Sequence, residues 1–466
     1  MTGPGARKVR RAIALSLVAL IAATCGSTLP DQRRPEWTSP GLVGGGGWPF
    51  AHEPMDAAEA AGAAYLPDSS VVRLADGRIR LIPMGGRQAI TVPADDPRVA
   101  DSVRGDRAWL ARGRVPGGDT VYRDMAVRAL LDLRLLTRPN GATTASWYRQ
   151  WNYVWPRDAA FAAAAFTVSG HPEEARRVLR FLARVQTGSG QWAARYEPDG
   201  SPVTDGREPQ LDSLGWVLWA SWFFRVHDTG DGAELPELWT MVRRAADHLA
   251  GSLDAEGLPP PSPDYFERDP GKEEDPRRPT LGVAAPVLTG LRAAADLAAR
   301  SGWRAEAVRW GRAADRLAAA VSRTFAPYGY PRSPVENGLM DTSVTFLGPP
   351  FARPDPGVTA AVRKAADRLR LPNGGVLPGE KWSGNPDVAW TPEMALFALN
   401  AASSGRIEDA LTRLDWLAEH RTELGVLPEK VDARGRPAAV APLGWTASTV
   451  LLTLSALAGP LPIPPA

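Results

Sequence analysis

From about Gly118 to the C-terminus, apolar residues recur at helical spacing in successive segments that are separated by loops rich in Gly and Pro. The clearest segment is His171–Gln186, where Pro172 suits the first turn and Glu173 suits the positive N-terminal end of a helix. Its apolar positions share one helical face: Ala175, Val178, Leu179, Leu182 and Val185. This pattern predicts an amphipathic helix packed against a core.

Eleven further segments have a helical pattern, and the one at 342–347 is the weakest. With the segment above, the predicted helices are Tyr122–Leu136, Ala159–Ser169, His171–Gln186, Leu211–His227, Glu237–Leu253, Ala284–Arg300, Ala305–Phe325, Thr342–Leu347, Val358–Leu369, Pro392–Ser403, Ile407–His420 and Thr446–Ala458. No repeat of fixed period is visible, which argues against a regular solenoid. Twelve helices paired around an axis would form a mainly α, (α/α)6 toroid with a pocket among the loops at one end. An irregular helical array is the alternative.

The region before residue 118 has a different pattern. Ser70–Leu74 and Arg78–Ile82 flank Ala75-Asp76-Gly77, which predicts a β-hairpin and hence a small N-terminal β element. Residues 31–50 are rich in Pro and Gly, as linkers are. We therefore divide the chain into a signal or anchor segment at 1–30, a linker and small β-containing region at 31–117, and an (α/α)6 catalytic domain at 118–466.

Residues 1–30 combine four basic residues with an apolar run from Ala12 to Ala23, which predicts an export signal. The run is shorter than the roughly 20 apolar residues that a membrane span needs. Cys25, the single cysteine, follows this run as the lipidated cysteine of a bacterial lipoprotein does, although the residues before it fit that signal poorly. We expect export to the cell exterior or to the outer face of the membrane, with attachment through the N-terminus as one alternative and secretion as the other.

Composition narrows the class of partner. The chain of 466 residues is 44% hydrophobic and 23% charged, as soluble globular proteins are. The formal net charge is +2, but four cations lie in residues 1–30, so the remainder is slightly acidic and offers no basic stripe for nucleic acid. No His, Cys or Glu cluster has metal-ligand spacing and no nucleotide fingerprint has its strand–helix context. We therefore expect neither a metal nor a cofactor.

Seventeen tryptophans are unusually many for this length, and the stretch at 151–158 combines two of them with a tyrosine. Trp151, Tyr153 and Trp155 alternate there, and Arg157 and Asp158 open a helix. Aromatic rings stack on the C–H face of a sugar, while the planar fork of an arginine binds polar oxygens. The alternative is a buried aromatic turn with a structural Arg-Asp pair. Trp216, Trp219, Trp222 and Phe223 have helical spacing and are more typical of a core.

Two glutamates lie on long loops between predicted helices, where polar residues serve chemistry more often than packing. Glu267 follows Tyr265 and Phe266, and burial against these rings would raise a carboxyl pKa. Glu429 follows Pro428 and precedes Lys430, a polar setting in which a carboxylate would stay ionised. Two carboxyl groups in unlike environments are what glycosidic cleavage uses. The alternative is that both are ordinary loop acids among the 52 acidic residues of the chain.

Five segments in order resemble those of glycoside hydrolase family 15, the glucoamylase and glucodextranase family, in its bacterial form. They are Tyr153–Asp158, Tyr196–Gly200 with Gln210–Asp212, Pro263–Glu267, Leu427–Asp432, and Ala441–Trp445. The resemblance covers roughly residues 120–460. Two departures stand out: Phe266 replaces the usual Trp, and Lys381–Asp387 follows the family's Gly-Asn-Pro-Trp pattern only in part, with Trp390 shortly after it.

The resemblance implies an inverting, exo-acting hydrolase of α-linked glucosides, with an oligo- or polysaccharide as substrate. Glu267 would be the general acid and Glu429 the general base, about 6.5–9.5 Å apart so that a water molecule fits between them. Arg157 and Asp158 would bind the hydroxyls of the terminal sugar, with Trp155 and Tyr265 as walls. In the matching segments, the further candidates for substrate binding are Gln210, Asp212, Trp390 and Trp445.

Two other functions stay open from the sequence. A degenerate toroid would keep the carbohydrate pocket and bind sugar without turnover. A polysaccharide lyase or a phosphorylase could use the same fold, but a lyase would want a Tyr/His or Tyr/Arg centre, and the candidate loops offer glutamates instead.

Overall fold

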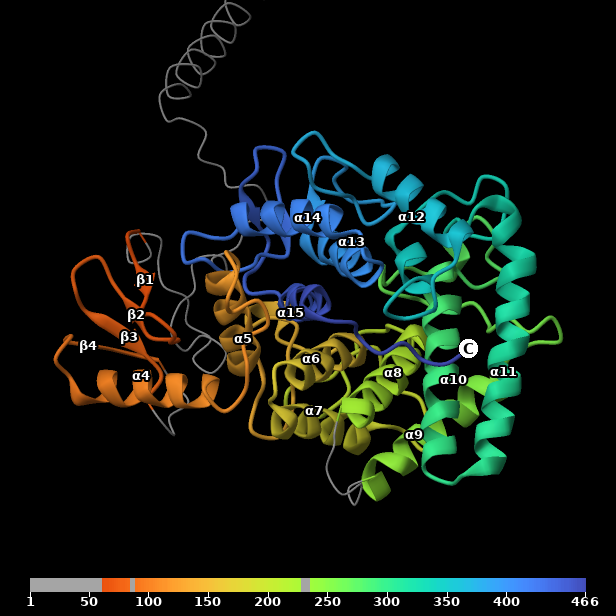
Figure 1. Ribbon diagram of the computed structural model, residues 1–466, viewed down its shortest axis with the longest axis horizontal. Helices are drawn as coiled ribbons and strands as arrows, with labels where there is room; N and C mark the ends of the chain where they lie inside the picture. The colour runs from red at the N-terminus through yellow and green to blue at the C-terminus, as the bar shows by residue number, and fades with distance from the viewer. Residues whose placement is uncertain (1–60, 84–88, 228–234) are drawn as a thin grey trace, which may run out of the picture. The chain divides into compact units, whose positions relative to one another are not determined.

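The computed structural model describes residues 61–83, 89–227 and 235–466, and helices dominate these ranges (Figure 1). From residue 123 on, and apart from three 3₁₀-helices of three residues each, the described helical elements are α5 (Arg123–Leu136), α6 (Pro156–Val168), α7 (Pro172–Val185), α8 (Leu211–His227), α9 (Leu235–Ser252), α10 (Leu281–Arg300), α11 (Arg304–Thr324), η5 (Thr342–Leu347), α12 (Pro356–Arg368), α13 (Thr391–Ser403), α14 (Ile407–Glu419) and α15 (Gly444–Ala458). Each predicted helix is confirmed, although η5 is a 3₁₀-helix and not an α-helix.

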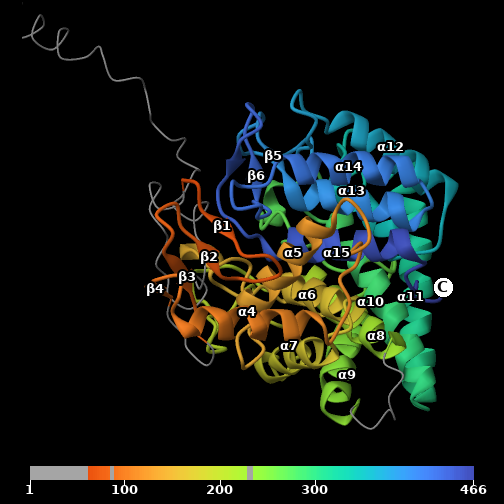
Figure 2. The ribbon, with the colours of Figure 1, turned by 60° about the vertical axis from the view of Figure 1, so that its left-hand side comes forward.

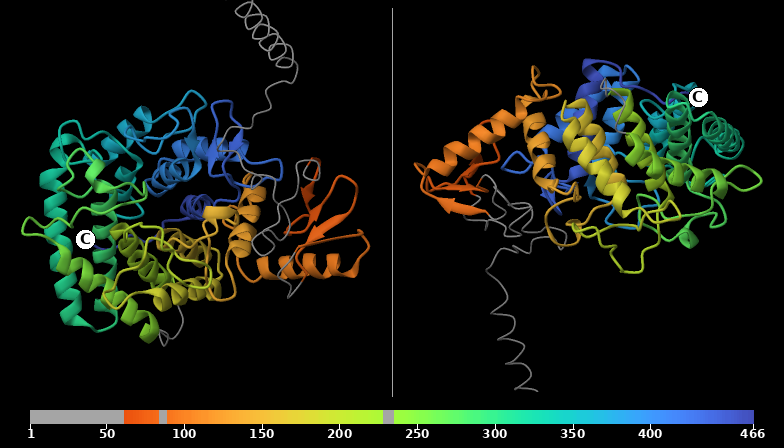
Figure 3. Two further views of the ribbon diagram at one scale, coloured as in Figure 1. Left: turned by 180° about the vertical axis from the view of Figure 1, so that it is seen from behind. Right: turned by 90° about the horizontal axis from the view of Figure 1, so that it is seen from below.

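These elements alternate between an outer and an inner ring. The inner elements contact one another in the order α6, α8, α10, η5, α13 and α15, and α15 closes the ring by packing on α6. The closure is visible from behind, where the blue C-terminal helix α15 lies beside the golden helix α6 (Figure 3). The predicted (α/α)6 toroid is therefore the observed fold.

Composition decides which ring a helix joins. The inner helix α6 is rich in alanine and is buried on every side, with twelve of its thirteen residues inside the protein. The outer helix α7 is amphipathic: Val178 and Leu182 are buried, while Arg180 and Arg184 are exposed. A helix that is apolar all round has to be enclosed, whereas a helix with one apolar stripe covers a core.

Small residues let two inner helices pack backbone against backbone. A Cβ atom at Gly215 of α8 would lie 2.1 Å from the carbonyl oxygen of Pro286 in α10, and one at Gly290 of α10 would lie 2.6 Å from Gly215 Cα. Both distances are far below van der Waals contact, so a side chain at either glycine would push the two helices apart.

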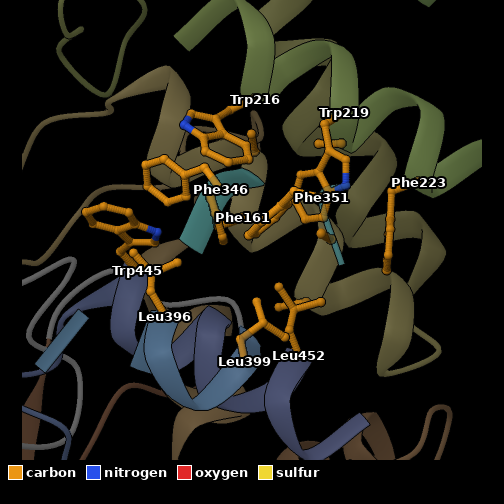
Figure 4. Packing of buried hydrophobic residues seen from close by; sticks show 14 of the residues in the cluster. Phe161, Trp216, Trp219, Phe223, Phe346, Phe351, Leu396, Leu399, Trp445 and Leu452 are labelled. Carbon is orange, nitrogen blue, oxygen red and sulfur yellow. The ribbon is translucent and has the colours of Figure 1, made fainter. Parts of the chain in front are cut away.

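Aromatic side chains fill the space inside the ring (Figure 4). The Phe161 ring contacts the Trp216 ring with centroids 5.1 Å apart, and Trp216 contacts Phe351 at 4.9 Å, both edge to face. The predicted core series Trp216, Trp219, Trp222 and Phe223 is buried throughout. The Trp445 ring lies 5.8 Å from Phe161 and so joins this core to the end of the ring where the candidate site lies.

A small antiparallel sheet precedes the toroid, and its strands are β1 (Ala64–Tyr65), β2 (Val72–Arg73), β3 (Ile79–Leu81) and β4 (Ile90–Val92). The predicted hairpin is confirmed as the β2–β3 pair. The sheet packs on the toroid through an apolar cluster that includes Val72, Leu136 and Val426.

The hydrophobic pattern does not predict helix α4 (Pro97–Leu110), which lies along this sheet (Figure 2). The helix has few apolar positions, and Val99 packs with Ile79 and Leu81 of β3. The signal was present in the helix start instead, because the Asp96 side chain caps the helix by accepting from Arg98 N, and Pro97 occupies its first turn.

The predicted export signal and Cys25 lie outside the described residues. Within the described ranges, one helix, α10, is long and apolar enough to cross a membrane by length and composition. Its apolar window is 83% buried inside the protein, as the core position of α10 in the inner ring requires.

Candidate active site

Eight of the ten predicted site residues line one cavity of about 230 Å³. They are Trp155, Arg157, Asp158, Tyr265, Glu267, Trp390, Glu429 and Trp445. The starts of the inner helices supply several of them, because Trp155 precedes α6, Trp390 precedes α13 and Trp445 lies in the first turn of α15. Helix N-termini carry partial positive charge and free N–H groups, so this end of the ring suits oxygen-rich ligands.

Arg157 lines the cavity and is 5% exposed. Its Nη1 donates to Asp212 Oδ2 and to Gln210 Oε1, each at 3.2 Å, and its guanidinium lies 5.0 Å from the Trp445 ring. Gln210 and Asp212 do not line the cavity, although substrate binding was expected of both. Both accept from Arg157 Nη1 and so orient its fork, and Gln210 lines a neighbouring pocket together with Arg207 and Glu267.

Asp158 contacts the other side of the same guanidinium, with its Oδ2 3.3 Å from Arg157 Nη2. This oxygen has no hydrogen-bond partner among the described residues. Burial raises the pKa of Asp158, with Glu429 adding to the effect and Arg157 opposing it. A buried carboxylate with an unused acceptor, facing a cavity, is a place where a ligand hydroxyl can donate.

Glu267 lies at the rim, and both of its carboxylate oxygens are engaged. Oε1 accepts a hydrogen bond from Trp155 Nε1, and Oε2 pairs with Arg207 Nη1. The Glu267 backbone has φ of 52°, in the left-handed region that a non-glycine residue adopts at a cost of about 1–3 kcal/mol. Its N–H donates to Asp264 O at 2.7 Å, which holds this turn. Phe266, in place of the expected Trp, lines the cavity beside it.

Glu429 reaches the same cavity from a different loop, which a second small sheet holds. The strands β5 (Ala389–Trp390), β6 (Lys430–Val431) and β7 (Pro437–Ala438) pair in that order, and β5 joins directly to α13. The Glu429 N–H donates to Val440 O at 2.8 Å, and its carbonyl accepts from Thr391 N at 3.0 Å. These bonds connect the loop before α15 to the first residue of α13.

The Glu429 side chain is 10% exposed, and its Oε2 lies 3.5 Å from Lys430 Nζ. The predicted polar neighbour Lys430 is therefore confirmed, and its Nζ lies 4.1 Å from the Trp390 ring centroid. Asp432 closes the β6–β7 turn, because its Oδ1 accepts from Arg434 N and Arg436 N. Glu429 Oε2 has no hydrogen-bond partner in the described part of the chain.

Several lining residues were not predicted. Arg195 and Arg207 come from the loop before α8, where both pair with Asp205, and Arg195 lies 5.2 Å from the Trp155 ring. Trp382 forms an aromatic wall against Phe266, with ring centroids 5.2 Å apart. On a sequence, loop arginines resemble ordinary solvated charges. The one available signal was their place in the chain, since Arg195 directly precedes Tyr196–Gly200 and Arg207 lies three residues before Gln210.

The fourth acid in the lining of the cavity, Glu393, was not predicted, and it is 2% exposed. It is the third residue of α13, a position where an acid is ordinary because it complements the helix dipole. Because acids are common at this position, the sequence gives no reason to single out Glu393. Across the described residues, no three His, Cys, Asp or Glu side chains are grouped so that they could hold a metal ion.

No family model and no curated protein sequence matches this chain. Solved structures do resemble it. A wild-type glycosidase superposes with a TM-score of 0.60 at 22% identity, over 75% of this chain and 98% of its own. A bacterial glucoamylase complexed with acarbose gives 0.62 at 16% identity, over 79% and 62%. The glucoamylase of Saccharomycopsis fibuligera gives 0.59 at 12% identity, over 74% and 96%. The chain shares the glucoamylase-like six-hairpin fold of these proteins.

Proposed function

We propose that this protein is an inverting, exo-acting glycoside hydrolase that removes sugar from the non-reducing end of α-linked glucosides. The observation that carries this proposal is that Glu267 and Glu429, far apart in the chain, line one cavity with Arg157 and Asp158. The fold shared with glycosidases and glucoamylases supports the same reaction class.

In this mechanism Glu267 is the general acid. Its Oε1 accepts from Trp155, so the proton for the leaving glycosidic oxygen would be carried on Oε2, the atom that Arg207 contacts. A guanidinium has donors only and cannot accept that proton. Arg207 must therefore move away from Oε2 before the leaving oxygen can take its place.

Glu429 is the general base. It removes a proton from a water molecule that attacks the anomeric carbon, while the bond to the leaving oxygen breaks on the other face of the sugar. Attack opposite to the leaving group inverts the anomeric centre, so an α-glucoside releases the β-anomer. We expect the two carboxyl groups to stand about 6.5–9.5 Å apart, which leaves room for the water.

The cavity itself favours the end of a chain over its middle. Its volume of about 230 Å³ lies below the roughly 300–1,000 Å³ of pockets that enclose drug-sized ligands. Arg157, bonded to Gln210 and Asp212, is a buried part of its lining. A terminal sugar fits such a pocket, and its hydroxyls would bind Arg157 and Asp158 while Trp155, Tyr265, Trp390 and Trp445 provide aromatic walls.

The decisive experiment is to incubate the protein with maltooligosaccharides, isomaltooligosaccharides and trehalose while following the anomers by NMR. We expect β-glucose as the first product. Glu267→Gln and Glu429→Gln should each reduce kcat by about 10²–10⁴-fold. Glu174→Gln is the matched control, because Glu174 is also a buried third residue of a helix, in α7, and does not line the cavity. Release of the α-anomer from the non-reducing end of maltooligosaccharides or isomaltooligosaccharides would disprove inversion, whereas trehalose should give one β- and one α-glucose because its leaving glucose keeps the α configuration.

One alternative has a specific observation in its favour. Arg207 contacts Glu267 Oε2, the oxygen that would deliver the proton. This contact would block a hydrolase, but it would not prevent a toroid from binding sugar without turnover. Isothermal titration with the same sugars separates the two functions. Binding without any product over the whole panel would favour the degenerate toroid.

We further propose that residues 1–30 direct export and that the protein acts as a monomer outside the cell. Fractionation of cells that express the wild type and Cys25→Ser tests this. A shift of the protein from the membrane to the medium in the variant would indicate lipid attachment, and medium for both would indicate secretion.

A further inference from the structure

Glu393 lies in the cavity wall, and the mechanism above does not use it. Its side chain is buried at 2% exposure, and its Oε2 finds no hydrogen-bond partner among the described residues. An unpaired buried carboxyl group costs several kcal/mol if it is ionised. A group of this kind, in the wall of a reaction cavity, needs an explanation beyond packing.

The backbone joins the first turn of α13, which carries Glu393, to the loop that carries Glu429. Thr391, two residues before Glu393, donates from its N–H to the Glu429 carbonyl at 3.0 Å and from its Oγ1 to the same oxygen at 3.2 Å. The strand pair Trp390–Lys430 flanks this contact. The first turn of α13 and the Glu429 loop are thus joined directly, and both side chains open into one cavity.

The charged and titratable groups around Glu393 come from four elements. Its own helix offers backbone N–H groups, α6 offers Arg157 and Asp158, and the β6 segment offers Glu429 and Lys430. The loop before α10 offers the Tyr265 hydroxyl, which interacts electrostatically with Glu393. Burial raises the pKa of Glu393 to about 8, and the negative charge of Glu429 adds to this effect. The helix backbone, Arg157 and Lys430 oppose it but do not cancel it. At neutral pH, therefore, Glu393 carries a proton.

That proton changes what the two glutamates can do for each other. Two ionised carboxylates are acceptors only, and neither can donate to the other. A protonated carboxyl group has one O–H donor, and Glu429 Oε2 is a buried acceptor without a hydrogen bond. A proton shared between two neighbouring carboxyl groups is a known way of keeping one of them ionised.

We propose that Glu393 is a positioning residue that donates a hydrogen bond to Glu429 and so fixes the orientation of the general base. This proposal rests on the function proposed above. With one oxygen of Glu429 held by Glu393, the other remains free to take the proton of the attacking water. Glu393 itself touches neither the substrate nor the water in this arrangement.

The protonation of Glu393 should make the activity depend on pH. Below about pH 8 Glu393 keeps its proton and the hydrogen bond stands. As the pH rises through about 8, the donor is lost and a second negative charge appears beside Glu429. Activity should therefore fall on the alkaline side, through kcat more than through KM.

The kinetic test compares Glu393→Gln with Glu393→Met. Glutamine keeps a donor at every pH, so Glu393→Gln should retain kcat within about threefold and move its alkaline limb to higher pH. Methionine has similar length but no donor, and Glu393→Met should lower kcat by about 10–100-fold with little change in KM. Glu174→Gln should leave the profile unchanged. Equal kcat in both Glu393 variants, or an alkaline limb that Glu393→Gln does not move, would overturn the proposal.

A second readout does not depend on activity. Infrared difference spectra recorded from pH 6 to 10 should contain a protonated-carboxyl band that titrates near pH 8 and is absent in Glu393→Gln. In Glu429→Gln this titration should shift to lower pH, because a neighbouring negative charge has been removed. A band that Glu429→Gln leaves unmoved would sink the proposal even if Glu393→Met does not fold. Should the band behave as expected while no glucoside is cleaved, the proposed hydrolase function fails and the Glu393–Glu429 contact stands.

Discussion

Two buried arginines, Arg332 and Arg157, are both surrounded by carboxylates, yet only one of them has all its bonds. Arg332 Nη1 lies 2.9 Å from Asp264 Oδ2 and 2.7 Å from Asp341 Oδ2, and Nη2 lies 2.9 Å from Glu273 Oε1. Its Nε donates to Glu273 Oε2 at 3.1 Å, and the guanidinium covers the Phe266 ring at 3.9 Å. Every face of this side chain is occupied.

Arg157 is also buried but is incompletely bonded. Its Nε has no hydrogen-bond partner among the described residues, and neither do Asp158 Oδ2 and Asp212 Oδ1. The unused atoms belong to a cluster that opens into the cavity. Native interiors rarely leave polar groups unpaired, and the exceptions concentrate where a ligand completes the bonding. The difference separates an arginine that builds the fold from one that is ready to bind.

The largest effect should come from Arg332→Met. It would leave three buried carboxylates facing one another, at a cost of about 3–5 kcal/mol in the free energy of unfolding. The loss should be smaller at pH 4 than at pH 7, because protonation removes the repulsion. Urea denaturation at the two pH values measures both quantities. If Arg157→Met proves equally destabilising, the distinction between the two arginines is wrong.

Arg157→Lys should have the next largest effect, and on activity. Lysine keeps the charge but not the planar fork that binds two oxygens at once. We expect kcat/KM on maltooligosaccharides to fall by about 10–100-fold, while the free energy of unfolding changes by about 1 kcal/mol. Arg332→Lys is the matched control at the other arginine. It should lower the free energy of unfolding while leaving kcat/KM of the folded fraction nearly normal. Similar results for both lysine variants would remove the contrast.

Much of the fold could be predicted because periodicity reports directly on burial. The apolar face of α7 and the uniformly apolar α8 and α15 are visible in the residues themselves. Helix α4 was missed because it buries few side chains and depends on its cap at Asp96. Where an apolar pattern is weak, the start signal of a helix carries more information than its face.

The site was predictable where aromatic and acidic residues lie in recognisable segments, and less so elsewhere. Glu267 and Glu429 were singled out from their loops, and both line the cavity. Arg332 and Glu393 were not, because a sequence does not show which charges will be buried together. Three carboxylates contact Arg332 from 9 to 68 positions away in the chain, a juxtaposition that only the toroid creates.

Gln210→Leu should give the smallest effect and is the finest test of the contrast. Gln210 Oε1 accepts from Arg157 Nη1 at 3.2 Å, and the leucine would remove this acceptor without changing the charge of the cluster. A hydrogen bond from a charged donor such as Arg157 to a neutral acceptor such as Gln210 contributes about 1–2 kcal/mol of free energy. Because the bond orients Arg157 towards the substrate, KM should rise about five- to tenfold with kcat nearly unchanged. Gln186→Leu is the control. Gln186 Nε2 donates to the Gly190 and Met241 carbonyls, and Gln186 does not line the cavity. This variant should therefore alter stability alone. A normal KM in Gln210→Leu would mean that the hydrogen bond to Gln210 is not needed to orient Arg157. The unpaired Arg157 Nε would then not depend on that orientation for binding.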